Sequence, residues 1–107
     1  MSKYAENTSV SSHKSREEIE NTLIRYSASQ FMYGWSQEDA IVGFAMNDRQ
    51  IRFILKMPDR EDVIFWQTPA KKTKRSPEQA SKEYDKATRQ KWRALALVIK
   101  AKLEAVE

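Results

Sequence analysis

The chain has 107 residues, a net formal charge of +4, 40% hydrophobic residues and 32% charged residues, which is the composition of one globular domain. It contains no cysteine and one histidine, His13, so disulfide scaffolds, thiol nucleophiles and cysteine-rich or histidine-rich metal sites are excluded. Residues 1–13 are polar and lack periodicity. We therefore expect a flexible N-terminal arm at 1–13, followed by a single domain at 14–107.

The first element predicted along the chain is a helix. Ser15 is followed three residues later by Glu18, which is the spacing of a capping box, in which each side chain bonds the other residue's backbone N–H. Apolar residues then recur at helical spacing, namely Ile19, Leu23 and Tyr26. The pattern predicts a helix over about 16–28.

Three segments of alternating apolar residues follow, and each predicts a β-strand: 31–35, 40–46 and 51–57. Asn47 and Asp48 tolerate positive φ and mark a tight turn between the second and third segments. A hairpin closed by residues 47–50 would bring the two apolar faces together. Its expected cross-strand pairs are Met46 with Ile51, Phe44 with Phe53, and Val42 with Leu55.

The last part of the chain predicts a second, longer helix. The apolar island at 63–66 is either a short fourth strand or a plug on the core. Ser76 is a candidate N-cap, Pro77 suits the first helical position, and Gln79 completes a capping box. Good helix formers without further glycine or proline continue the helix over about 77–105. The predicted fold class is α+β, with an N-terminal helix, an antiparallel meander of three or four strands, and a long C-terminal helix packed on the sheet.

Positive charge is concentrated in the last third of the chain. Residues 1–70 hold 8 Lys/Arg and 10 Asp/Glu, a net charge of −2, whereas residues 71–107 hold 11 and 5, a net charge of +6. Five cations of the long predicted helix fall within about 60° of one another on a helical wheel and form one basic stripe: Lys82, Lys86, Arg89, Arg93 and Lys100. A basic run stands directly before that helix: Lys71, Lys72, Lys74 and Arg75. Such a surface can bind nucleic-acid phosphates with release of counterions, or it can be a solvated helix face.

Further residues extend or interrupt this basic surface. Cations of the predicted hairpin turn and third strand enlarge it: Arg49, Arg52 and Lys56. Lys91 and Lys102 fall inside the apolar sector of the long helix, so the end of that helix is a candidate surface for a homodimer. Trp35 and Trp66 are candidates for base stacking or for anchoring a protein partner, although aromatic residues in strands beside a helix more often form core.

The sequence lacks the patterns that common catalytic sites require. Its two glycines, Gly34 and Gly43, do not form a glycine-rich phosphate loop. Carboxylates that could hold magnesium, but are more often solvated in such a loop, follow the third predicted strand: Asp59, Glu61 and Asp62. We therefore expect no enzyme activity, no cofactor and no metal. No apolar run approaches the ~20 residues that span a bilayer, and no signal-peptide pattern is present, so we expect a cytoplasmic protein without membrane association.

Three stretches of the chain carry a resemblance to known proteins: 15–20, 31–35 and 93–107. They resemble a family of small uncharacterised proteins of bacteriophages and prophages, which implies a setting near DNA replication and recombination and supplies no catalytic residues. The order of one helix, three strands and one helix is also similar to that of double-stranded RNA-binding domains, which place a basic helix N-terminus against phosphates. The long third connection and the extended last helix depart from that pattern.

These observations favour one function and leave a second one open. The preferred prediction is a non-enzymatic nucleic-acid-binding accessory protein of phage DNA replication or recombination, which contacts phosphates through its basic C-terminal helix. The alternative is a protein-binding module, such as a phage inhibitor of a host or defence protein, because an acidic N-terminal half is joined to a long amphipathic helix. Phosphate binding weakens steeply with salt, whereas an apolar protein interface does not.

Overall fold

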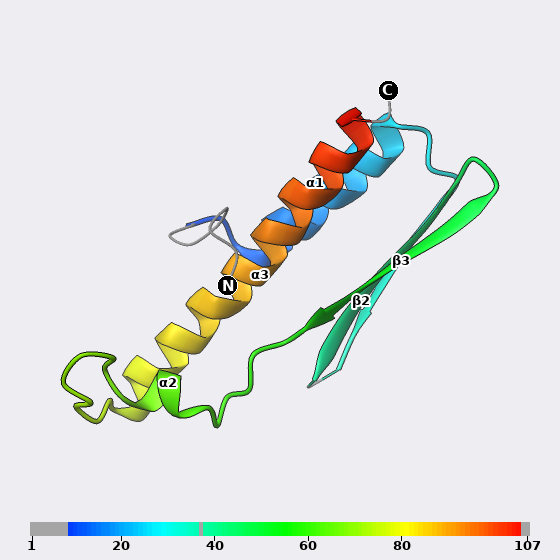
Figure 1. Ribbon diagram of the computed structural model, residues 1–107. Coiled ribbons are helices and arrows are strands. Elements are labelled where there is room, and N and C mark those ends of the chain that lie inside the picture. Colours follow the sequence, from blue (N-terminus) through cyan, green and yellow to red (C-terminus); the bar gives the residue numbers. More distant parts are fainter. Residues whose placement is uncertain (1–8, 37, 106–107) are drawn as a thin grey trace.

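The computed structural model describes residues 9–36 and 38–105, and it confirms the predicted α+β order of elements (Figure 1). The molecule is elongated, with principal extents of 51 × 24 × 18 Å. Both long helices lie on one side of a three-stranded antiparallel sheet of order β1-β2-β3. The elements are α1 (Ser12–Arg25), β1 (Gln30–Trp35), β2 (Asp39–Met46), β3 (Arg49–Lys56), α2 (Val63–Trp66) and α3 (Pro77–Ala105).

The β2–β3 hairpin has the predicted faces but not the predicted register. Phe44 is paired with Ile51 and Val42 with Phe53, a shift of two residues from the predicted pairs. The turn contains two residues rather than four, since Asn47 and Asp48 both have positive φ, at 52° and 61°, as a type I′ turn requires. A shift of two residues keeps every side chain on its original face, because side chains alternate along a strand.

The start of α1 differs from the predicted capping box. Ser11 is the N-cap, and its side-chain oxygen accepts a hydrogen bond from the backbone N–H of Lys14 at 3.1 Å. Ser15 therefore lies inside the helix, where it is fully buried and its hydroxyl has no hydrogen-bond partner among the described residues. The helix thus begins within the stretch expected to be a flexible arm, of which residues 1–8 lie outside the described part of the chain.

The start of α3 confirms the predicted capping box. The Ser76 hydroxyl accepts from the Gln79 N–H at 3.2 Å, and the Gln79 side-chain oxygen accepts from the Ser76 N–H at 3.0 Å. Proline at the first helical position costs nothing there, since that N–H has no intrahelical partner. The helix then continues for 29 residues, with the predicted limits of 77–105.

The apolar island before α3 forms one turn of helix, α2, and not a fourth strand. Asp62 caps this turn by accepting a hydrogen bond from the N–H of Ile64 at 3.1 Å. Phe65 is buried, and its ring meets the ring of Tyr84 edge-on at 5.8 Å. The island is therefore a plug on the N-terminal half of α3.

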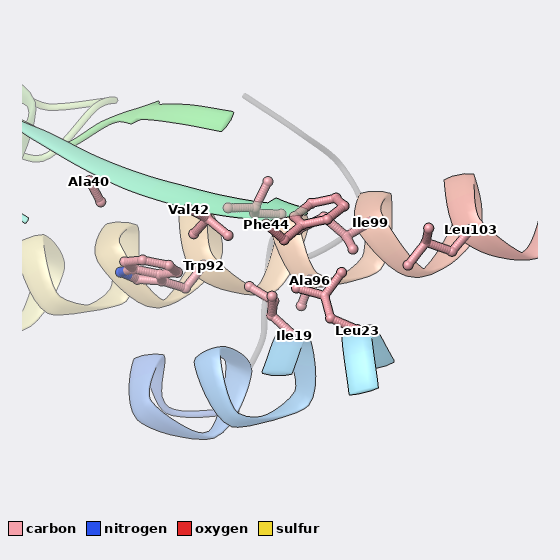
Figure 2. Close-up of a cluster of buried hydrophobic side chains, with 10 residues drawn as sticks. Ile19, Leu23, Ala40, Val42, Phe44, Trp92, Ala96, Ile99 and Leu103 are labelled. Atoms are coloured by element: carbon pink, nitrogen blue, oxygen red, sulfur yellow. The ribbon is translucent and has the colours of Figure 1, made fainter. Parts of the chain in front are cut away.

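The main core lies between the sheet, α1 and the C-terminal half of α3 (Figure 2). Side chains from all three converge there, namely Ile19, Leu23, Ala40, Val42, Phe44, Trp92, Leu95, Ala96, Ile99 and Leu103. The Arg16 guanidinium of α1 lies over the rings of Tyr33 at 5.4 Å and Trp92 at 5.0 Å. Arg16 therefore connects α1 with β1 and α3. The inward residues of β3 are only partly buried.

We expect Leu23→Ala to lower the free energy of unfolding by about 2–5 kcal/mol, because Leu23 is fully buried and its truncation leaves a cavity in the core. The adjacent Ile24 is 66% exposed, so Ile24→Ala should change stability by less than about 0.5 kcal/mol. Urea unfolding followed by circular dichroism measures both. Equal losses in the two variants would contradict the orientation of α1.

The two-residue turn makes a separate prediction at Asp48. Glycine has no Cβ to strain a positive φ, so Asp48→Gly should be more stable than Asp48→Ala by about 1 kcal/mol. Arg49 lies in extended β3 and is the matched control, where alanine should be more stable than glycine. Thermal unfolding of the four variants tests this, and the same order of stability at both positions would exclude a turn with positive φ at Asp48.

Candidate nucleic-acid interface

The candidate phosphate-binding residues lie along α3 and the loop before it, and the structure separates them into two groups. Lys71, Lys72 and Lys74 are exposed in the loop at the N-terminal end of α3, and Lys82 is exposed within ~8 Å of that end along the helix axis. Among the described residues there are three ion pairs, and none of them involves these lysines. We call these four residues the basic end (loop and α3 in Figure 1).

The loop that carries three of these lysines is held by hydrogen bonds. The Thr68 N–H donates to the carbonyl of Thr73 at 2.9 Å, and the Lys72 N–H donates to the carbonyl of Thr68 at 3.0 Å. The Thr68 hydroxyl also accepts from the Thr73 N–H at 2.9 Å. These bonds give the backbone of the basic run a defined path and place Lys71 and Lys72 at its tip.

Arg75 has a structural role, although the sequence predicts that it contacts phosphate. Its guanidinium donates to the carbonyls of Ile64 at 3.0 Å and Phe65 at 3.4 Å, and it pairs with Glu83 at 3.3 Å. The side chain is 15% exposed. These contacts join α2 to α3, and they engage both terminal nitrogens of Arg75 within the protein.

The predicted basic stripe is not continuous along α3. Arg93 pairs with Glu18 of α1, and Arg89 is half-buried with its Nε shielded from solvent. Lys86 is also half-buried, whereas Lys100 is exposed near the far end of the helix. The helical wheel placed these five side chains on one face correctly, but it could not show that α1 packs against the same face.

The two candidate tryptophan anchors have different surroundings. Trp35, at the end of β1, is 76% exposed. Trp66 is half-buried in α2, and its indole Nε1 donates to the carbonyl of Arg60 at 2.9 Å. The guanidinium carbon of Arg60 in turn lies 4.1 Å from the centre of the Tyr84 ring. Trp35 is therefore available to a partner, whereas Trp66 helps to fix α2 on α3.

The carboxylates considered for magnesium are used by the local backbone. Asp59 accepts from the N–H of Glu61 at 2.9 Å, and Asp62 is the N-cap of α2. Over residues 9–36 and 38–105, the side chains of His, Asp and Glu form no group of three or more that could hold a metal ion. These contacts give the loop acids a structural role in turn formation.

An apolar groove at the other end of the molecule was not predicted. It measures about 520 Å³ and lies between the β2–β3 turn and the last turns of α3. It is lined by Phe44, Met46, Asn47, Arg49, Ile51, Phe53, Ile99, Lys102 and Leu103. Two of the described residues that line the groove, Arg49 and Lys102, are cations, and none of them is acidic. The sequence signal for the groove was Lys102 in the apolar sector of the helix, which indicated that this sector is not fully covered.

Comparisons with protein-family models, curated proteins and solved structures found no match to this chain. The resemblance to phage and prophage proteins therefore stays a prediction from the three stretches named above. None of the helices in the described ranges is both long enough and apolar enough to cross a membrane.

The Arg93–Glu18 contact makes a prediction about stability. Both side chains are partly exposed, at 22% and 45%, so a double-mutant cycle with Glu18→Gln and Arg93→Gln should give a coupling of about 0.5 kcal/mol that falls with added salt. A second cycle that combines Glu18→Gln with Lys100→Gln is the control, and its effects should be additive. Urea unfolding measures all variants. Additive effects in the first cycle would show that Arg93 is free of Glu18.

Proposed function

We propose that this protein is a non-enzymatic nucleic-acid-binding accessory protein whose basic end contacts phosphates without reading base sequence. The observation that carries the proposal is the grouping of four exposed lysines at one end, none of them in an ion pair within the described residues. Each phosphate that a lysine neutralises releases condensed counterions, so the binding is driven by charge and weakens with salt.

The chemistry of the basic end favours positioning on the backbone of a nucleic acid over base recognition. Lysine is a flexible point charge, and it lacks the planar fork with which arginine recognises guanine. Two acids of α3, Glu78 and Asp85, lie near Lys82 on the helical wheel and lower the local positive potential. We therefore expect moderate affinity that depends strongly on salt.

Two resemblances support this proposal. The similarity to phage and prophage proteins implies a setting of DNA replication or recombination. Double-stranded RNA-binding domains share the order of elements and place a basic helix N-terminus against phosphates, and the basic end stands likewise at the start of a helix, α3. The proposal leaves the choice among single-stranded DNA, duplex DNA and duplex RNA to experiment.

The test is fluorescence anisotropy with each of these three labelled nucleic acids at several salt concentrations. The variant Lys71→Glu/Lys82→Glu should bind at least about tenfold more weakly, and its plot of log affinity against log salt should be flatter by about 2. The control is Lys100→Glu/Lys102→Glu, which has the same net charge but changes exposed lysines at the other end of α3. It should lose less affinity than the first variant.

Two results would overturn the proposal. Equal weakening in the two variants would show that net charge alone attracts the nucleic acid, with no contribution from the grouping of the lysines. No binding of the unmodified protein at near-physiological salt to any of the three nucleic acids would show that the basic end is only a solvated surface.

A further inference from the structure

The outer edge of the sheet at β3 is open. In the described part of the chain no further strand pairs with β3. In a two-residue hairpin the residues that flank the turn, here Met46 and Arg49, form a hydrogen-bonded pair, and such pairs recur at every second position. The Met57 N–H, which donates to the Glu38 carbonyl at 2.8 Å, agrees with this alternation. The N–H and C=O groups that point outward belong to Gln50, Arg52, Ile54 and Lys56.

The apolar groove lies beside this open edge. The inward side chains of β3 form a partly buried row along the helix-facing side of the sheet: Ile51, Phe53 and Leu55. Two of them line the groove together with Ile99 and Leu103 of α3. Each of these three side chains keeps part of its surface accessible. A strand added to β3 would lie about 4.8 Å away, with alternate side chains beside this row.

The charges along the edge are all positive. Arg52 and Lys56 point to the outer face of β3, and Arg49 and Lys102 stand at the end of the groove. Lys56 pairs with Asp39 at 3.6 Å but stays 73% exposed. A second copy of β3 would bring like charges together, which opposes pairing between copies. An added strand with acidic residues on its outer face would meet opposite charge at Arg52 and Lys56.

We infer that the β3 edge binds an extended peptide of a protein partner in which apolar and acidic residues alternate. The peptide backbone bonds the outward N–H and C=O groups of β3, as in other cases of strand addition. Its apolar side chains extend the row of Ile51 and Phe53 into the groove, and its acidic side chains face Arg52 and Lys56. This site goes beyond the proposed nucleic-acid binding, because it uses the opposite end of α3.

The experiment uses the full chain and a labelled eight-residue peptide of alternating Val and Glu, with binding measured by fluorescence anisotropy. Two control peptides are alternating Val and Lys, and a Val-Val-Glu-Glu repeat that has the same composition as the first peptide without its alternation. We expect the alternating Val/Glu peptide to bind at least about tenfold more tightly than either control, because it alone matches the charges and the two-residue period of a strand.

A charge-swap variant makes the test specific to this edge. Arg49→Glu/Arg52→Glu should lose at least about tenfold in affinity for the Val/Glu peptide and gain affinity for the Val/Lys peptide. Lys71→Glu/Lys82→Glu, with the same net charge, should bind the Val/Glu peptide almost as the unmodified protein does. Because the two variants change different ends, failure of this proposal and failure of nucleic-acid binding give different results.

Amide exchange measured by NMR provides a second readout. Bound peptide should slow exchange at Gln50, Arg52, Ile54 and Lys56, whose N–H groups point outward, more than at Ile51, Phe53 and Leu55. Equal affinity for the Val/Glu peptide in the unmodified protein and the charge-swap variant would overturn the proposal. So would protection without alternation, or formation of a dimer through β3 in place of peptide binding.

Discussion

The burial of one face of α3 is the interaction on which the rest of the structure depends. The helix contributes Trp92 and Ile99 to the core that it shares with α1 and the sheet, and it contributes Tyr84 to the contact with α2. Its 29 residues extend ~43 Å, whereas the eight residues of β2 extend only ~27 Å. The sheet and α1 therefore cover one half of the helix, and the single turn of α2 covers the other.

This unequal cover gives the same residue types different roles along one helix. Arg93 lies where α1 packs on α3, and it forms an ion pair with Glu18 of α1. Lys82 lies beyond the end of α1 and has no ion pair in the described part of the chain. The apolar groove at the C-terminal end of α3 also results from incomplete cover, because two helices do not cover the full width of three strands. The elements packed around each position of α3 therefore decide whether a cation pairs within the protein, as Arg93 does, or stays exposed, as Lys82 does.

Local sequence signals predicted the elements, and they failed where several local solutions were equally good. Ser76 and Gln79 fixed the start of α3 because proline allows one position for the cap. Ser15 has the sequence pattern of a capping box, but Ser11 is the N-cap, and Ser15 is buried inside the helix. Turns of two and four residues align the same hairpin faces, so apolar pattern alone could not give the register. For the candidate site, the helical wheel gave the faces but not the docking position of α1.

The thin cover on the N-terminal half of α3 has a consequence for local unfolding. Few buried contacts hold this segment, chiefly Phe65 on Tyr84 and the Arg75 bonds to α2, so it can open at a lower free energy than the whole protein. The basic end stands on this weakly held segment. A polyanion that binds only the closed form would stabilise the segment by linkage, and the affinity would include the free energy needed to keep it closed.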